Sequence, residues 1–281
     1  MYLNFLGIQK KMVEQMAKKI LIATSKGGVG KSTVAINTAD LLSEKGYKVL
    51  LVDTDAQGHC SISLGKNPLK YYNTIFELLK EEAAINECIH TLYENLDILP
   101  SNLNLFDIDE VLSVRKKLTP HFALQKNLKL VDDLYDYIVI DSPPNLGMMA
   151  YNAIIASDFI VIPVDSSFLG LEGYIRIKNT INKNIIPDIG REIKEKILLT
   201  MYDKRTKLSK QVKATIVARY GEDSVFKTYI NRNTDIQKST AQGLSIRKFS
   251  SKVKHTPQGY TDFKFFVSEL LSILTEDEAI G

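Results

Sequence analysis

Short, nearly continuous apolar runs alternate with helical segments along this chain of 281 residues. Such runs are typical of strands buried on both faces in a parallel sheet, whose crossover connections are helices. The pattern predicts a doubly wound α/β fold, with a mainly parallel sheet and helices on both of its faces. We expect strands at residues 18–24, 47–55, 96–101, 135–144, 158–165 and 195–203. Helices are expected at 31–46 and 207–221, each ending at a glycine.

The chain shows no internal repeat and no Pro/Gly-rich linker, so we expect a single domain over residues 18–281. Residues 1–17 would form an N-terminal extension, expected to be helical. No stretch reaches the roughly 18 apolar residues that a bilayer-spanning helix needs, which favours a cytoplasmic protein. Two cysteines, Cys60 and Cys88, stand in no metal-binding or CxxC spacing, which argues against a disulfide framework or an iron–sulfur cluster.

The net charge of +3 is unevenly distributed. Residues 191–254 carry 16 Lys and Arg against 6 Asp and Glu, a net charge of +10, which leaves −7 for the rest of the chain. A basic region of this kind attracts phosphate polymers, although a lysine-rich solvated surface would give the same count. Charge alone leaves both interpretations open.

Glycines and a lysine stand where the first strand gives way to a helix, at residues 25–33. In doubly wound sheets, ligands bind at the carboxyl ends of the strands, which is where these residues lie. The glycines let backbone N–H groups turn inward toward an anion, and the helix start adds its positive dipole end. Lys31 supplies a charge for the terminal phosphates of a nucleotide, and Ser32 supplies a hydroxyl for Mg²⁺. The first glycine of the usual phosphate-loop pattern is replaced by Ser25.

Three carboxylates end neighbouring predicted strands. Asp53 and Asp55 follow one apolar run and Asp141 follows another. Asp141 has the position of an acid that holds Mg²⁺ directly or through water, and Asp55 that of an acid that orients an attacking water. A single aspartate there would be an ordinary turn residue, but three on one edge favour a site.

Five segments carry a family resemblance: they read SKGGVGKST, LLVDTDAQGHCS, YIVIDSPPNLG, VIPVDSSFLGLEG and ILLTMYDKRTKLSKQV. In this order and spacing they resemble the deviant Walker A ATPases of the ParA/Soj/MinD group, most closely the ParA-type partition ATPases. The resemblance covers about residues 18–275 and implies a P-loop ATPase domain. It implies ATP and Mg²⁺ as cofactors and weak hydrolysis of ATP to ADP and phosphate by the protein alone.

The resemblance also implies roles for residues of this chain. Lys26, the extra lysine of the loop, would reach across an ATP-sandwich homodimer to the phosphates held by the other subunit. Catalysis would involve Lys26, Lys31 and Asp55. Mg²⁺ would be held by Ser32, Asp55 and Asp141. ATP binding would involve Lys26, Gly27, Gly28, Val29, Gly30, Lys31, Ser32 and Thr33, with Met201 and Asn231 near the adenine.

ParA-type ATPases bind DNA without sequence preference through their C-terminal half, which gives the basic region a function. The implied DNA-binding residues are Lys210, Lys213, Arg219, Arg232, Lys238, Arg247, Lys248 and Lys252. A centromere-binding partner, ParB-like or of the ribbon-helix-helix type, would stimulate hydrolysis. The protein would then be nucleoid-associated.

Three alternatives share the phosphate loop. A MinD-like membrane-cycling ATPase would end in a basic amphipathic helix, whereas residues 262–281 end in an acidic tail and their Phe and Leu are expected to pack on the domain. Residues 1–19 mix apolar and basic side chains, and a docked helix or a membrane segment would both fit. A nitrogenase-like iron protein would need cysteine ligands that Cys60 and Cys88 do not match. A non-hydrolysing scaffold would not need Asp55.

Overall fold

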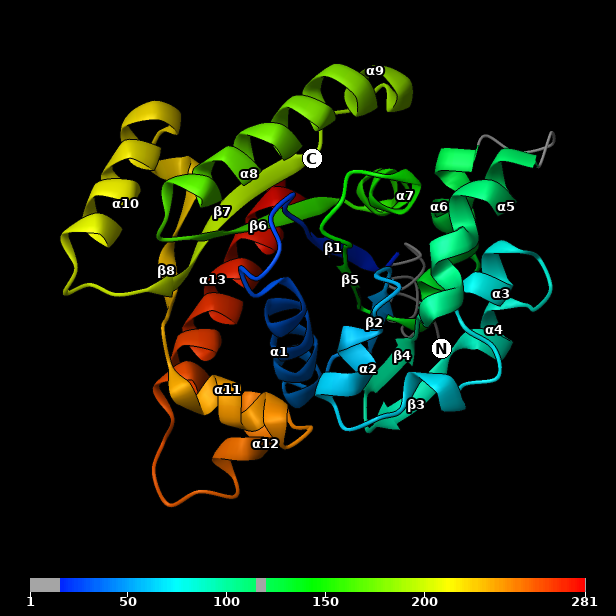
Figure 1. Ribbon diagram of the computed structural model, residues 1–281, viewed down its shortest axis with the longest axis horizontal. Coiled ribbons are helices and arrows are strands. Elements are labelled where there is room, and N and C mark those ends of the chain that lie inside the picture. Colours follow the sequence, from blue (N-terminus) through cyan, green and yellow to red (C-terminus); the bar gives the residue numbers. More distant parts are fainter. Residues whose placement is uncertain (1–15, 115–119, 281) are drawn as a thin grey trace, which may run out of the picture.

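The computed structural model describes residues 16–114 and 120–280. One eight-stranded sheet runs through them in the order β3-β4-β2-β5-β1-β6-β7-β8 (Figure 1). All neighbouring strands are parallel except β3 and β4, which form an antiparallel pair. The strands are β1 Lys18–Ile22, β2 Val49–Asp53, β3 His90–Tyr93, β4 Leu96–Leu99, β5 Tyr137–Asp141, β6 Phe159–Asp165, β7 Lys194–Tyr202 and β8 Val225–Asn231.

The α-helices lie between the strands and, after β8, at the end of the chain. They are α1 Lys31–Glu44, α2 His59–Ser63, α3 Ile75–Leu79, α4 Ile85–Cys88, α5 Ile108–Val114, α6 Ala123–Leu128, α7 Met148–Ala156, α8 Phe168–Thr180, α9 Ile186–Ile189, α10 Lys207–Tyr220, α11 Thr234–Ala241, α12 Ile246–Ser250 and α13 Gln258–Ile280. The predicted fold class, a doubly wound α/β layer with helices on both faces, is confirmed.

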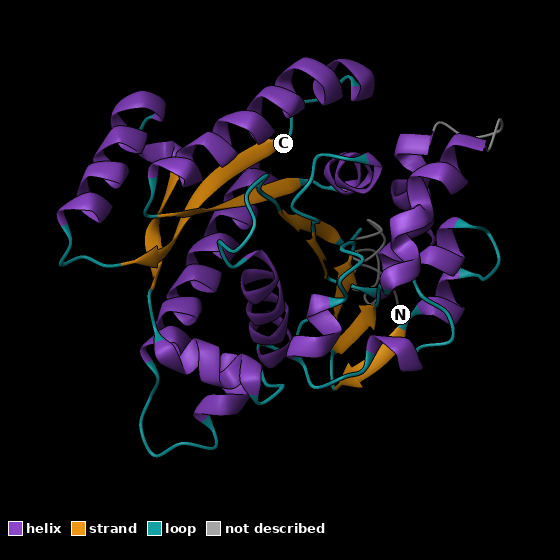
Figure 2. Cartoon of the chain, viewed as in Figure 1, coloured by secondary structure: helices purple, strands orange, loops and turns teal. Residues whose placement is uncertain are grey.

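The sheet separates two hydrophobic layers. Figure 2 shows the helices that lie on either face of it. On one face α1, α12 and α13 pack on the sheet. On the other face α3, α5, α6, α7, α8 and α10 cover it. The central strands are buried on both sides, which explains why their sequences are continuously apolar rather than alternating.

Two strands were not predicted from the sequence. The edge strand β8 is one of them: its exposed Lys227 and half-buried Tyr229 break the apolar run that marked the central strands. β3 is the other, a four-residue edge strand that pairs only with β4 and lies partly exposed. Both are edge strands, which need only one buried face and so lack the continuous apolar signal.

The predicted helix ends follow the glycines closely. α1 ends at Glu44, two residues before Gly46, whose φ of 91° places it in the left-handed region. α10 begins after Thr206, whose side chain accepts a hydrogen bond from the N–H of Ser209, and it ends before Gly221. The predicted helical extension at residues 1–17 lies outside the described residues, apart from positions 16 and 17.

Candidate nucleotide site and basic face

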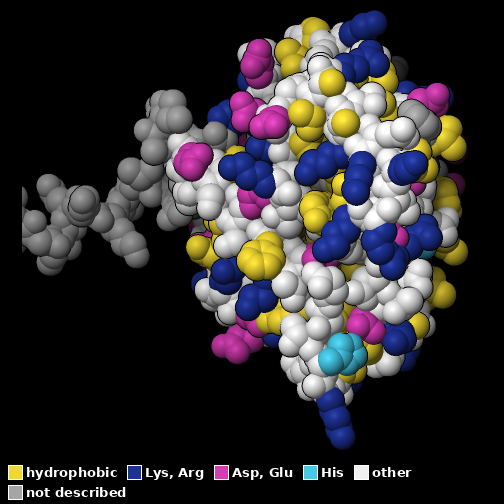
Figure 3. Space-filling view, turned by 90° about the vertical axis from the view of Figure 1, so that its left-hand side faces the viewer, with side chains coloured by type: hydrophobic (Ala, Val, Ile, Leu, Met, Phe, Trp, Pro, Cys, Tyr) yellow, Lys and Arg dark blue, Asp and Glu magenta, His cyan; other side chains and the backbone are white. Residues whose placement is uncertain are grey.

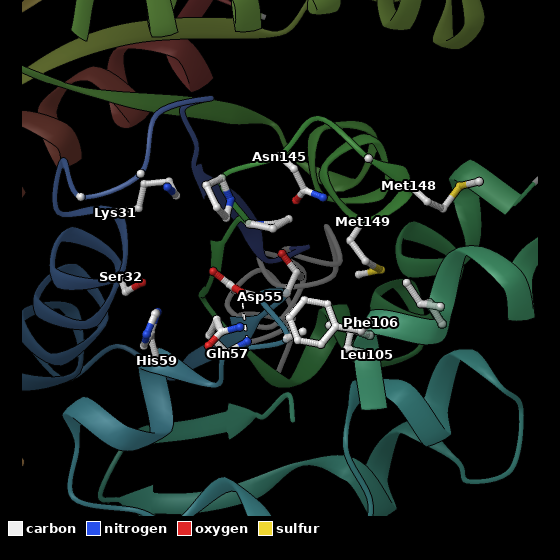
Figure 4. Close-up of a pocket in the computed structure, with 18 of the residues that line it drawn as sticks. Lys31, Ser32, Asp55, Gln57, His59, Leu105, Phe106, Asn145, Met148 and Met149 are labelled. Atoms are coloured by element: carbon white, nitrogen blue, oxygen red, sulfur yellow. Dashed lines mark hydrogen bonds between the residues drawn. The ribbon is translucent and has the colours of Figure 1, made fainter. Parts of the chain in front are cut away.

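A cavity of about 510 Å³ opens at the carboxyl edge of the sheet. The loops after β1, β2 and β5 reach it together because these strands are parallel neighbours, with Asp53 beside Asp141 and Asp141 beside Ile22 in register. Figure 4 shows Lys31, Ser32 and Asp55 directed into this cavity, with Phe106 and Met149 facing them. The topology therefore assembles the residues that the sequence placed at strand ends.

The glycine loop from Gly27 to Gly30 forms one wall of the cavity. Gly28 and Gly30 have φ angles of 76° and 91°, which L side chains rarely adopt. A Cβ at either position would have no heavy atom within 4 Å, so the backbone faces open space. α1 begins directly after Gly30, and its first N–H groups are available to an anion.

Lys31 is the buried cation of the site. Only 7% of its surface is exposed, and its ammonium donates a hydrogen bond of 3.2 Å to the main-chain oxygen of Lys26. Burial lowers the pKa of Lys31, and the nearby charges of Asp141 and Asp55 oppose that shift. A buried ammonium with so few partners is suited to a phosphate group, which supplies the missing negative charge.

Asp53 and Asp55 have different surroundings. Asp53 is fully buried, and its carboxylate accepts hydrogen bonds from the N–H groups of Asp55 at 3.1 Å and Cys60 at 3.0 Å. Burial, followed by the charge of Asp141, raises the pKa of Asp53 well above its usual range. The buried carboxylate of Asp53 thus holds the loop between β2 and α2 in place. Asp55 lines the cavity, and its carboxylate accepts a hydrogen bond from the N–H of Gln57 at 3.0 Å.

Asp141 lies behind the cavity wall at the end of β5. Burial raises its pKa to about 6, and the nearby hydroxyl of Ser32 together with the charge of Lys31 opposes the rise. Its Oδ2 accepts the Cys60 thiol at 3.4 Å, whereas its buried Oδ1 has no hydrogen-bond partner among the described residues. An unpartnered buried carboxylate oxygen beside a serine hydroxyl fits the oxygen-rich coordination of Mg²⁺.

A second, more apolar cavity of about 760 Å³ shares Gly30 and Thr33 with the first. Met201 and Asn231, the predicted adenine neighbours, both line it. Asn231 is fixed by two hydrogen bonds of 2.9 Å, from its main-chain and side-chain N–H groups to Asp262. A nucleotide with its phosphates at the glycine loop could place its base here.

Lys26 is one of two predicted ATP-binding residues of the loop that do not line the 510 Å³ cavity, which we call the phosphate cavity after its predicted ligand. Its ammonium is bound to Asp165 and Ser167, on the side of the loop that faces α8. Val29 does not line that cavity either; its main-chain oxygen accepts the hydroxyl of Thr200 at 2.9 Å, which anchors the loop to β7. The remaining residues of the predicted loop, 27–28 and 30–33, all line it.

The far wall of the phosphate cavity was missed by the sequence analysis. It consists of Leu105, Phe106 and Ile108, which precede or begin α5, and of Met148 and Met149 at the start of α7. Phe106 is 63% exposed, which is unusual for so large an apolar side chain. No residue pattern distinguishes these positions from core residues in the sequence, because their place depends on how two helices pack beside the loop.

The predicted DNA-binding residues are spread over the α10–β8 side and the α11–α12 region. Figure 3 views the molecule from this side and shows many Lys and Arg side chains, with hydrophobic side chains between them. The exposed members are Lys210, Arg219, Arg232, Lys238 and Lys252. Lys213 is half-buried over the ring of Tyr229, and Lys248 lies 3.1 Å above the ring of Tyr93.

A polar hollow of about 640 Å³ on the same side adds cations that the sequence analysis did not single out. Lys204, Arg205 and Lys227 line it together with Arg232, and all four are exposed. Arg205 pairs with Asp203 at 2.8 Å, but 85% of its side-chain surface is exposed. These positions meet because the β7–α10 loop lies next to strand β8.

Arg247 does not fit the predicted DNA-binding role. Its guanidinium forms two hydrogen bonds, of 2.7 and 2.8 Å, to the carboxylate of Asp40, which is fully buried in α1. Ser245 and Tyr93 donate to the same carboxylate at 2.8 Å each. The side chain of Arg247 is occupied inside the fold, where it joins α12 to α1, and we assign it to packing.

Replacing Arg247 with alanine should lower the free energy of unfolding by roughly 2 to 4 kcal/mol, because a buried carboxylate loses its cation. Two neutral donors remain on Asp40, which keeps the loss below that of a completely unpaired charge. Chemical denaturation measures this loss, and Lys238→Ala, at an exposed cation on α11, serves as the control with little change. Weaker DNA binding at unchanged stability would contradict the packing assignment.

The C-terminal helix α13 packs on the sheet through five buried side chains, which are Phe263, Phe266, Val267, Leu270 and Leu274. The expectation that the C-terminal Phe and Leu pack on the body is therefore confirmed for these positions, but it is wrong for Phe265, which is 65% exposed. Among the described residues, no helix combines the length and the apolar character that crossing a bilayer requires.

Comparison with known proteins shows which family the chain belongs to. A family model described as an AAA domain matches residues 17–194. The sporulation initiation inhibitor protein Soj of Bacillus subtilis is 37% identical over 82% of this chain and 90% of its own length. The chromosome partitioning protein ParA of Caulobacter vibrioides is 32% identical over 83% of this chain and 87% of its own length.

Solved structures give the same result. A candidate plasmid partition protein from Borrelia burgdorferi, bound to AMPPNP, is 28% identical, with a TM-score of 0.75 over 91% of this chain and 99% of that one. Cobyrinic acid a,c-diamide synthase from Mycobacterium smegmatis, with an ATP analogue and magnesium, is 27% identical, with a TM-score of 0.75 over 91% and 94% of the two chains. Both neighbours carry an ATP analogue and the synthase also carries magnesium, which agrees with the predicted cofactors ATP and Mg²⁺. With its phosphate loop, strand-end carboxylates and sequence identities, the chain belongs to the Soj/ParA family of partition ATPases.

Proposed function

We propose that this protein is a DNA-partition ATPase, in which ATP and Mg²⁺ assemble a homodimer that binds DNA without sequence preference. The observation that carries the proposal is the combination of a phosphate cavity with a separate basic face in one chain related to Soj and ParA. Nucleotide binding at the cavity would control dimerisation, and a dimer would present two basic faces to the DNA instead of one.

Within the cavity each residue has a distinct task. The N–H groups of the glycine loop and the ammonium of Lys31 bind the phosphates, and Thr33 at the start of α1 lies toward the α-phosphate. The hydroxyl of Ser32, supported by Asp141, would hold Mg²⁺, and the ion would supply charge neutralisation for phosphoryl transfer. Asp55 orients a water molecule and accepts its proton.

The opposed orientation of the two loop lysines supports a two-subunit site. Lys31 lines the cavity of its own subunit, whereas Lys26 does not. In the proposed sandwich dimer the ammonium of Lys26 contacts the phosphates of the partner subunit. Nucleotide binding and dimerisation then become one event, since a cation at the interface needs the anion that the bound nucleotide supplies.

The basic face gives the DNA-binding surface. We assign to it the exposed predicted residues, the partly buried Lys213 and Lys248, and the three cations found in the hollow beside β8. These are Lys210, Lys213, Arg219, Arg232, Lys238, Lys248, Lys252, Lys204, Arg205 and Lys227. Phosphate contacts from such a surface carry no sequence information, so nucleoid association of a cytoplasmic protein follows.

A centromere-binding partner, ParB-like or of the ribbon-helix-helix type, would stimulate hydrolysis and release the dimer from DNA. The MinD-like alternative has less support from the described residues, because most large apolar side chains of α13 are packed against the sheet, with Phe265 as the exposed exception. Hydrolysis without a partner is expected to be weak.

Binding to a non-specific DNA duplex with ATP, ADP or no nucleotide, in Mg²⁺ and across a salt series, tests the proposal. We expect ATP-dependent binding whose affinity falls steeply with salt, with a log–log slope of about −5 if six phosphates are contacted. Arg232→Ala should reduce that slope by about 1. Lys126→Ala on α6, at the opposite edge of the molecule, is the matched control (Figure 1). No binding at low salt would contradict the proposal and direct the next assay to liposomes.

A further inference from the structure

The ammonium of Lys26 has no free hydrogen-bond donor in this structure. It lies 2.9 and 2.7 Å from the two carboxylate oxygens of Asp165 and 3.0 Å from the hydroxyl of Ser167. A lysine ammonium has three N–H donors, and these three acceptors use all of them. Lys26 can therefore bind a phosphate only after it leaves Asp165.

The two residues that accept hydrogen bonds from Lys26, Asp165 and Ser167, are held in place by further hydrogen bonds. Asp165 ends β6, and Ser167 caps α8 by accepting the N–H of Gly170 at 3.1 Å. The hydroxyl of Ser167 also lies 2.9 Å from Oδ1 of Asp165. The carboxylate is thus held in place next to the glycine loop.

Two glycines of α8 make room for this arrangement. A Cβ at Gly170 would lie 2.3 Å from Oδ1 of Asp165, a distance that no side chain tolerates. A Cβ at Gly173 would lie 3.2 Å from the Cβ of Lys26, and the main-chain oxygen of Gly173 accepts the hydroxyl of Ser25 at 3.1 Å. The start of α8 therefore fits closely around Lys26 and its acceptor.

The Lys26–Asp165 ion pair is accessible enough to be exchanged. The side chains of Lys26 and Asp165 are 25% and 21% exposed, so water and a second molecule can reach them. By comparison, Lys19 and Asp132 form an ion pair with side chains only 8% and 5% exposed, which is suited to a permanent role. Because a partly exposed ion pair is weak, the free energy of binding a nucleotide phosphate is enough to release Lys26 from Asp165.

We propose that Asp165 is a positioning residue that holds Lys26 within the single subunit and so opposes assembly until nucleotide phosphate in a partner subunit replaces it. The inference rests on the proposed ATP dimer for its consequence, but the holding of Lys26 can be measured without it. Because a dimer needs two released lysines, the effect on the dimerisation constant is squared. If about one subunit in ten has Lys26 released, dimerisation is weakened about a hundredfold.

Asp165→Asn tests the proposal, because it keeps the size of the side chain and removes its charge. In the nucleotide-free protein, competitive amine labelling read by mass spectrometry should show Lys26 reacting about five- to tenfold faster than in the wild type. With AMPPNP and Mg²⁺, sedimentation should show a dimer dissociation constant lowered about ten- to a hundredfold. Gly170→Ala should also speed the labelling of Lys26, because its Cβ would lie 2.3 Å from the carboxylate and 2.7 Å from the main-chain oxygen of Asp165 and would force both to move.

Asp188→Asn, at an exposed carboxylate on α9, is the matched control and should change neither measurement. Unchanged labelling of Lys26 in Asp165→Asn would overturn the proposal, even if ATP dimers form normally. A weaker dimer in Asp165→Asn would overturn it as well, by showing that Asp165 supports assembly. Faster labelling of Lys26 with no dimer in either protein would uphold the holding role and reject the proposed ATP dimer.

Discussion

Lys31→Ala is expected to abolish ATP binding, with an affinity loss of about a hundredfold or more, because one charge-assisted contact in a site shielded from water is worth about 3 to 4 kcal/mol. In the nucleotide-free protein the same substitution should leave the fold intact. The ammonium of Lys31 is buried beside a single main-chain acceptor, and its lowered pKa shows that its charge is poorly compensated there. Alanine removes that buried charge and one weak hydrogen bond.

Thermal unfolding with and without Mg²⁺–ATP measures both expectations at once. At an ATP concentration a hundred times the dissociation constant, the wild type should gain about 2.7 kcal/mol of stability. Lys31→Ala should gain almost nothing, whereas Lys45→Ala, at the exposed end of α1, should behave as the wild type. A full ATP-induced gain in Lys31→Ala would show that the phosphates bind elsewhere.

Asp55→Ala is expected to reduce ATP turnover by at least a hundredfold while ATP binding persists, since general-base assistance contributes about 10²- to 10⁴-fold. Loss of hydrolysis should leave the ATP dimer on DNA, so the complex formed with ATP should dissociate much more slowly than that of the wild type. Stopped-flow release of DNA after addition of competitor measures this trapping, and phosphate release measures the turnover.

Asp109→Ala is the control for the Asp55 experiment, because Asp109 is an exposed carboxylate that lines the same cavity. It should keep wild-type turnover and wild-type release from DNA. Unchanged turnover in Asp55→Ala would remove the water-orienting role from this residue. Loss of ATP binding in Asp55→Ala would instead point to a main role in holding Mg²⁺.

The grouping of the candidate site residues at one edge of the sheet could be predicted, because they are local in sequence or repeat at strand ends. Three glycines before Lys31 indicate a phosphate loop by themselves, and Asp53 and Asp141 follow apolar runs that only a parallel sheet brings together. Periodicity likewise predicted the buried central strands. These features depend on short stretches of chain, so the sequence contains their signal directly.

The parts that escaped prediction depend on contacts between distant residues. Asp165 binds Lys26 across 139 positions, and nothing in the segment around Asp165 distinguishes this acceptor from an ordinary strand end. Arg247 looked like one more surface cation, because its partner Asp40 lies 207 positions earlier in a helix. Strand β8 lacked the apolar run of the central strands because it lies at the edge of the sheet.

The close approach of Gly170 to Asp165 also bears on how this chain can change over generations. A side chain at position 170 collides with Asp165 twice, since its Cβ would lie 2.3 Å from the carboxylate and 2.7 Å from the main-chain oxygen, so a lineage cannot acquire one without rearranging this turn. Substitutions at positions 165 and 170 are therefore expected to depend on each other. Loss of the aspartate at 165 would not be enough to admit alanine at 170, because the main-chain oxygen of residue 165 would still lie 2.7 Å from the new Cβ.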